Sequence, residues 1–125
     1  MARILIAEDE EPLRALCARA LAIDGHEVET ASDGGDALDL IVRQDGRFDL
    51  LLTDIRMPIM DGIALALTAA RDYPMLTILL MTGYADQRER AHGLDAIIHD
   101  VISKPFSVAT LRGAVTEALT VRARN

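Results

Sequence analysis

The residues best suited to chemistry stand directly after short apolar runs of the chain. Four runs end in such groups, namely the acids Glu8 and Asp9, the acid Asp54, the hydroxyl of Thr82 and the ammonium of Lys104. Carboxylates that lie together raise one another's pKa and need a counter-charge. Oxygen ligands without His or Cys favour a hard cation such as Mg²⁺, which takes one or two carboxylates and a phosphate. These residue types therefore indicate a Mg²⁺ site if the fold gathers them.

Phosphoryl transfer is the chemistry that such a site fits. A carboxylate can act as the nucleophile and become an aspartyl phosphate, and Asp54 is the candidate nucleophile. The chain's one lysine, Lys104, offers a compact ammonium that meets a phosphoryl oxygen end-on, beside the hydroxyl of Thr82. Gly83 has no side chain and would leave Asp54 open to an incoming donor. The bond before Pro105 is a candidate cis peptide that aims the lysine inward.

Five short apolar runs must position these groups: Ile4–Ala7, Val28–Ala31, Leu50–Thr53, Ile78–Met81 and Val101–Ser103. The first, third and fourth are almost wholly apolar, as in strands covered on both faces, whereas the second alternates and predicts an edge strand. Helical segments lie between the runs, so the pattern predicts an α/β fold, a doubly wound three-layer sandwich around a parallel sheet. Sites in such sheets form beyond the carboxyl ends of the strands, which is where the polar groups stand.

The helical segments are recognised by apolar residues three and four positions apart. These residues are Leu13, Leu16, Cys17, Ala20 and Leu21, then Leu38, Ile41 and Val42, then Ile63, Ala66, Leu67 and Ala70, and finally Leu111, Ala114, Val115, Ala118 and Leu119. Ser107 is the expected N-cap of the last helix. The polar stretch within residues 84–94 predicts a helix that buries little and moves easily.

Composition excludes several classes of function. The 125 residues suit one domain, and a formal charge of −7 argues against nucleic-acid binding. No apolar run reaches the roughly 20 residues that cross a bilayer, and no signal peptide precedes the first strand, which predicts a cytoplasmic protein without a membrane role. The single cysteine, Cys17, is expected in the core and can form neither an internal disulfide nor a thiolate cluster.

Taken in order, the motifs resemble the receiver domain of two-component response regulators, the CheY-like family. They are Glu8-Asp9, Thr53-Asp54-Ile55-Arg56-Met57-Pro58 with Met60-Asp61-Gly62, Thr82-Gly83 and Ser103-Lys104-Pro105-Phe106. The resemblance implies a five-stranded sheet of order 2-1-3-4-5, as in flavodoxin and CheY. It assigns residues 1–120 to a receiver domain and 121–125 to a tail, with no output domain.

The resemblance also implies a role for each matching position. Asp54 is the phospho-acceptor, Glu8 and Asp9 bind the metal together with Asp54 and the backbone carbonyl of Arg56, Thr82 is the switch hydroxyl, Lys104 pairs with the phosphate, and the bond before Pro105 is cis. Mg²⁺ is the implied cofactor. A histidine kinase or histidine phosphotransfer protein supplies the phosphate. The fourth helix, fifth strand and fifth helix report it to a protein effector.

One position departs from the family pattern. Val101 stands where the family often has a Tyr or Phe that swings inward, so aromatic swinging cannot be the readout here. The nearest aromatic residue is Tyr84, expected beside the pocket mouth as a gate or partner contact. The chain further resembles the CpdR group of single-domain regulators, which are phosphorylation-controlled adaptors for a ClpXP-type protease.

Three other interpretations stay open. A Mg²⁺-dependent aspartyl phosphatase would need a second acid two positions after the nucleophile, where this chain has Arg56. A flavodoxin-like nucleotide binder would need free backbone N–H groups after the first strand, where Glu8 and its acidic neighbours would repel an anion. The chain could also be a receiver fragment of a larger regulator or hybrid kinase.

Overall fold

A single parallel sheet organises the molecule. The computed structural model describes residues 1–83 and 89–124 of the chain. The strands are β1 (Arg3–Ala7), β2 (Glu27–Ala31), β3 (Leu50–Asp54), β4 (Thr77–Thr82) and β5 (Asp100–Ser103). They pair in parallel in the order β2-β1-β3-β4-β5. This topology confirms the predicted fold, and every predicted apolar run lies within a strand.

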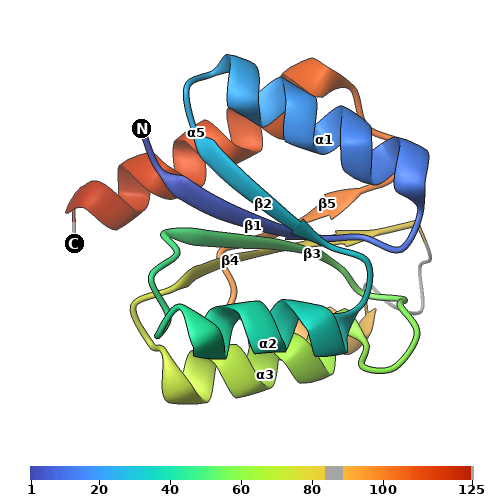
Figure 1. Ribbon diagram of the computed structural model, residues 1–125, viewed down its shortest axis with the longest axis vertical. Helices are drawn as coiled ribbons and strands as arrows, with labels where there is room; N and C mark the ends of the chain where they lie inside the picture. Colours follow the sequence, from blue (N-terminus) through green and yellow to red (C-terminus); the bar gives the residue numbers. More distant parts are fainter. Residues whose placement is uncertain (84–88, 125) are drawn as a thin grey trace.

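Helices cover both faces of the sheet, which gives three layers (Figure 1). They are α1 (Glu11–Ile23), α2 (Gly34–Arg43), α3 (Gly62–Asp72) and α5 (Val108–Arg124), with a short 3₁₀ turn η1 (His92–Leu94) before β5. Helices α1 and α5 lie on one face, and α2 and α3 on the other (Figure 1). Because α5 continues to Arg124, residues 121–124 extend the last helix.

Side-chain caps fix the starts of three helices. The carboxylates of Asp33 and Asp61 accept hydrogen bonds of 2.8 Å from the backbone N–H groups of Asp36 and Ala64, at the starts of α2 and α3. The Ser107 hydroxyl accepts one of 3.0 Å from the Thr110 N–H, which confirms the cap predicted for the last helix. A cap of this kind satisfies a donor that the first helical turn leaves unpaired.

The core lies on both sides of the sheet because β1, β3 and β4 are buried almost throughout. Alternate residues of β1 point to opposite faces, so Leu5 joins the cluster under α2 and α3 while Ile4 and Ile6 join the cluster under α1 and α5. Strand β2 lies at the edge of the sheet and is more exposed, as its alternating pattern predicts. Packing on both faces of the sheet thereby holds the carboxyl ends of the central strands in place.

Three helical positions differ from the prediction. Leu16, Val42 and Leu67 were expected on buried stripes, but 49 %, 56 % and 49 % of their surfaces are exposed. Neighbouring residues turn by about 100° around a helix, so the adjacent Cys17 and Ala66 reach the core while the leucines lie at its margin. Periodicity thus overstates the width of the buried stripe.

The prediction that the polar stretch within residues 84–94 buries little is confirmed where the structure describes it, because Glu89 and Arg90 are exposed. Residues 84–88 lie outside the described residues. After Arg90, Ala91 is fully buried, and Leu94 packs against the cluster under α2 and α3. Ala91 and Leu94 therefore contribute to the core. Across residues 1–83 and 89–124, no helix has both the length and the apolar character that a bilayer requires.

Candidate functional site

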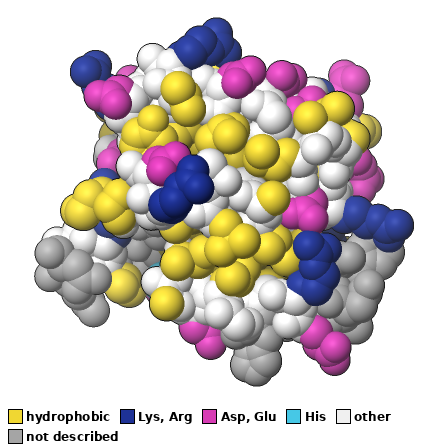
Figure 2. Space-filling model, turned by 90° about the horizontal axis from the view of Figure 1, so that it is seen from below, with side chains coloured by type: hydrophobic (Ala, Val, Ile, Leu, Met, Phe, Trp, Pro, Cys, Tyr) yellow, Lys and Arg dark blue, Asp and Glu magenta, His cyan; other side chains and the backbone are white. Residues whose placement is uncertain are grey.

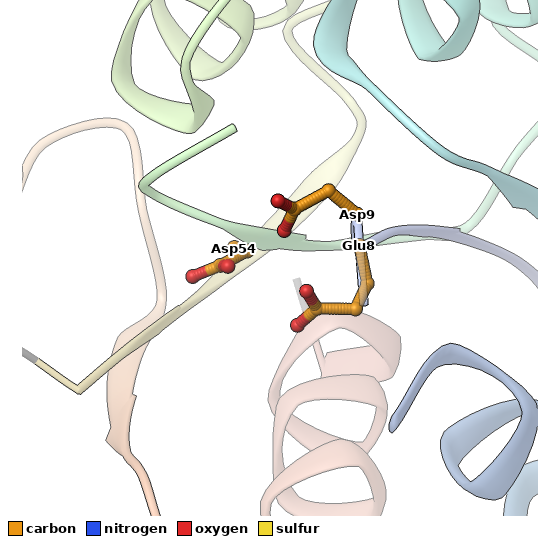
Figure 3. Close-up of side chains that lie close together, drawn as sticks. All are labelled: Glu8, Asp9 and Asp54. Atoms are coloured by element: carbon orange, nitrogen blue, oxygen red, sulfur yellow. The ribbon is translucent and has the colours of Figure 1, made fainter. Parts of the chain in front are cut away.

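Three carboxylates meet beyond the ends of β1 and β3 (Figure 3). Glu8, Asp9 and Asp54 each offer an oxygen, and these oxygens all lie within 4.8 Å of one another. The sheet brings them together, because β1 pairs with β3 and places Ala7 opposite Thr53. Glu8 and Asp54 are buried, whereas Asp9 is exposed, so the cluster is reached from the side of Asp9.

Lys104 reaches this cluster from the end of β5, the strand at the edge of the sheet opposite β2. Its Nζ donates hydrogen bonds to Glu8 Oε1 at 2.8 Å and to Asp54 Oδ2 at 3.1 Å. Its backbone N–H donates to the Thr82 carbonyl at 2.8 Å, and its peptide bond to Pro105 is cis. Residues nearly a hundred positions apart thus form one charged centre.

Burial has the largest effect on the pKa values of Glu8 and Asp54. The pKa of Glu8 is raised to about 7, chiefly because burial penalises the charged form, and the hydrogen bond from Lys104 only partly offsets this. Burial also raises the pKa of Asp54, with a further contribution from the negative charge of Asp9. Repulsion between the clustered carboxylates, which is the cause expected from the sequence, raises both pKa values by less than burial does. The pKa of Lys104 is raised because its two carboxylate partners outweigh its burial.

The donor set fits a divalent metal ion. Three carboxylates face one ammonium, so the described cluster has more negative than positive groups. Clustered carboxylate oxygens, one of them exposed, suit a hard cation that keeps several waters. Glu8, Asp9 and Asp54 are the residues that could hold it.

Two further predicted site residues flank Lys104. Thr82 is buried at the end of β4 and lies opposite Ser103 in the strand register. Gly83 follows it and is exposed. A Cβ placed on Gly83 would contact Lys104 Cβ at 3.6 Å, an ordinary separation, so the fold itself tolerates a small side chain there. The structure therefore places both residues directly beside the lysine.

The remaining predicted residues lie farther out. Arg56 is exposed in the loop after β3, two residues beyond Asp54. Val101 is half-buried in β5 and packs against the core cluster under α2 and α3. Tyr84 lies outside the described residues. Cys17 is fully buried, as expected, and burial raises the pKa of its thiol to about 11.

Three supporting contacts were not predicted from the sequence. The Thr53 hydroxyl donates to the Asp54 carbonyl at 2.9 Å. The Arg14 guanidinium donates to the Glu8 carbonyl at 2.9 Å and so ties α1 to the acidic pair. Asp61 forms an ion pair of 2.9 Å with Arg90, which links the start of α3 to the segment before η1. Only Thr53 gave a signal, as a polar residue inside an apolar run.

A doubly wound sheet with acids and a lysine at its carboxyl edge defines the CheY-like class of α/β proteins. The chain belongs to the response regulator receiver domain family, since the profile of that description matches residues 4–116. Proteins of this family are phospho-acceptor switches in two-component signalling and act with histidine kinases and downstream effectors.

Individual relatives agree with this assignment. Response regulator MprA of Mycobacterium sp. (strain KMS) is 37 % identical over 109 residues, which cover 87 % of this chain and 46 % of that protein. The chain thus spans about half the length of the curated relatives it matches. A CheY-like receiver domain protein from Methanospirillum hungatei JF-1 superposes with a TM-score of 0.90 at 30 % identity, covering 99 % and 98 % of the two chains.

A third relative is TrrA of Thermotoga maritima, whose structure was solved in complex with Mg²⁺ and beryllofluoride. It superposes with a TM-score of 0.82 at 29 % identity, covering 94 % of this chain and 99 % of TrrA.

Proposed function

We propose that this receiver domain is a Mg²⁺-dependent switch in which Asp54 accepts a phosphoryl group. The observation that carries the proposal is the position of Lys104 Nζ, at 3.1 Å from Asp54 Oδ2 and 2.8 Å from Glu8 Oε1. A fixed ammonium beside a nucleophilic carboxylate can stabilise the negative oxygens of a transferred phosphoryl group. The three carboxylates within 4.8 Å supply the metal ligands.

The chain's own residues account for most of the reaction. An oxygen of Asp54 attacks the phosphorus of a phosphohistidine, the P–N bond breaks, and the imidazole leaves with the bonding electrons. Lys104 then donates to a phosphoryl oxygen, and Thr82 supplies the switch hydroxyl. Glu8, Asp9 and the Arg56 carbonyl complete the ligand set with Asp54. A bound Mg²⁺ would neutralise charge on the phosphoryl oxygens.

The phosphoryl donor is a histidine kinase or a histidine phosphotransfer protein in the cytoplasm. The output is protein binding through the face that contains the segment before β5, β5 itself and α5. The resemblance to the CpdR group makes a ClpXP-type protease the first effector to test. The TrrA structure supports the cofactor, because that relative binds Mg²⁺ with beryllofluoride. The phosphorylated state ends by hydrolysis within the same site.

Acetyl phosphate tests the proposal directly. With Mg²⁺, intact mass spectrometry should show one added phosphoryl group on the wild-type protein and none on Asp54→Asn. Asp95→Asn, which changes an exposed acid outside the site, should be labelled like the wild type. Equal labelling of Asp54→Asn would overturn the assignment of the acceptor. Sustained turnover of a phosphate ester would instead identify the aspartyl phosphatase considered above.

A further inference from the structure

The outer face of α2 and α3 exposes several large hydrophobic side chains. Val42 on α2 is 56 % exposed, Leu67 on α3 is 49 % exposed, and Ile59 in the loop before α3 is 85 % exposed. Figure 2 shows this face, with hydrophobic side chains gathered over the two helices. A monomer rarely leaves large hydrophobic side chains gathered in the open, and such patches mark interaction sites.

Ile59 extends this apolar surface along α2. A Cβ placed on Gly35 would lie 3.1 Å from Ile59 Cγ2, so the isoleucine side chain rests on the first turn of the helix. Leu38 and Val42 follow Gly35 at intervals of three and four residues and therefore lie on the same side of α2. The φ angle of Ile59 is +71°, a left-handed conformation that is costly for a β-branched residue. The loop therefore holds this exposed side chain in place at a cost in backbone energy.

Charged side chains of both signs lie beside the exposed hydrophobic residues of α2. Asp36 and Asp39 lie towards the start of α2 and Arg43 lies in its last turn, and all three side chains are exposed. Asp39 and Arg43 are one helical turn apart and share a side of the helix. Arg43 Nε also donates to the backbone carbonyl of Asp39 at 3.4 Å, which holds the guanidinium along the helix surface.

We propose that this face, which we call the α2–α3 face (Ile59, Leu38 and Val42 with Asp39 and Arg43), binds a second copy of the chain. A two-fold axis level with Ile41 would set the α2 helices antiparallel. Each Asp39 then meets Arg43 of the second copy, and the two Val42 side chains pack beside the axis. A self-complementary pattern of both charges is what an isologous dimer requires, whereas a uniformly acidic or basic partner would match only half of it.

This proposal is independent of the phospho-acceptor assignment, so its test uses unphosphorylated protein in EDTA. Sedimentation velocity at increasing concentration should show a monomer–dimer equilibrium for the wild type. Val42→Asp should weaken the dimer by about tenfold or more, since it buries an unpaired charge. Leu16→Asp on α1 is the matched control, because Leu16 is also a half-exposed hydrophobic residue of a helix, 49 % exposed against 56 % for Val42. It should associate like the wild type.

Charge exchange gives a second readout that does not depend on removing apolar surface. Asp39→Arg alone should weaken association, because it sets two arginines against each other, and the double variant Asp39→Arg with Arg43→Asp should restore it. Circular dichroism verifies that every variant is folded. A wild type that stays monomeric throughout, a dimer disrupted only by Leu16→Asp, or a double variant no better than the single one would each overturn the proposal.

Discussion

Glu8 is the most deeply buried of the site acids. It directly follows β1 at a point where the backbone is already covered by helices, so none of its surface is exposed. Its oxygens accept hydrogen bonds from Lys104 Nζ at 2.8 Å and from the Glu10 N–H at 3.1 Å. These bonds favour the charged form but do not outweigh burial, and the pKa of Glu8 stays raised at about 7. Above neutral pH, where Glu8 is ionised, its burial therefore lowers the stability of the folded state.

The raised pKa of Glu8 predicts how stability depends on pH. Its ordinary value is 4.5 and its folded value about 7, so between these pH values the folded protein binds a proton that the unfolded chain releases. The contribution of Glu8 to the free energy of unfolding should thus be largest below pH 4.5 and be lost as pH rises through 7, by about 3 kcal/mol at ~1.4 kcal/mol per pH unit. Urea unfolding in EDTA at several pH values measures this.

Glu8→Gln is the control for that experiment, because a neutral amide has no proton to release. Its stability should be nearly flat across the same window, apart from the smaller contribution of Asp54, whose pKa burial also raises. The titration of Asp61 does not add to the change in stability within this pH range. The Ala64 N–H and Arg90 outweigh its burial and lower its pKa, so it titrates below the window. A wild-type stability that increases from pH 5 to pH 7 would contradict the prediction.

The central site residues could be predicted from sequence because parallel strands end at one edge. Glu8, Asp54 and Lys104 each follow an apolar run, and strand order alone brings them together. The contact of Arg14 with the Glu8 carbonyl could not be predicted in this way, since it depends on the angle at which α1 leaves the sheet. The pairing of Asp61, at the start of α3, with Arg90, before η1, likewise depends on the conformations of two side chains that are far apart in the sequence.

The loop between β3 and α3 is the element that joins the acceptor to the rest of the fold. Gly62 packs against the Asp54 backbone, where a Cβ would lie 2.0 Å from the Asp54 carbonyl oxygen. At the other side of the loop, a Cβ on Gly34 would lie 2.1 Å from the Met60 carbonyl oxygen. Neither separation is possible for a real side chain, so glycine is needed at both positions for the loop to lie this close.

Gly34→Ala should therefore destabilise the protein. The methyl group must push the Met60 carbonyl away from α2, and overpacking of this kind costs roughly 1–3 kcal/mol. Gly113→Ala in α5 is the matched control, because a Cβ there meets nothing within 4 Å and alanine favours the helix by about 0.5–1 kcal/mol. Urea unfolding should give opposite signs for the two variants. A neutral or stabilising Gly34→Ala would show that the contact is loose.

Strands were easier to predict than the faces of helices, for a physical reason. A run such as Leu50–Thr53 is buried on both faces, so all of its residues share the same buried environment. A helix has a gradual margin, and Leu16 and Leu67 lie on it with about half of their surface exposed. Sequence cannot tell whether such a residue reaches the core, because that depends on the helix rotation and on the size of neighbours such as Cys17.

Charge is distributed unevenly over the whole molecule. The chain has 20 acidic and 13 basic residues. Arginines at the margins have partners of their own, as in the pairs of Arg112 with Asp24 at 2.6 Å and Arg122 with Asp49 at 3.2 Å. At the site, by contrast, three carboxylates face the ammonium of Lys104. The folded protein thus concentrates negative charge at one edge of the sheet, and unfolding disperses it.

This distribution predicts that Mg²⁺ stabilises the folded state. An ion that binds the folded but not the unfolded chain adds RT ln(1 + [Mg²⁺]/Kd) to the free energy of unfolding, about 2.7 kcal/mol at a hundred times Kd. Asp9→Asn removes a ligand that is exposed, while Glu8 and Lys104 keep their hydrogen bond. The urea midpoint of the wild type should rise with the logarithm of Mg²⁺ concentration, and that of Asp9→Asn should respond far less. NaCl at matched ionic strength separates site binding from screening. An equal response of the two proteins would place the ion elsewhere.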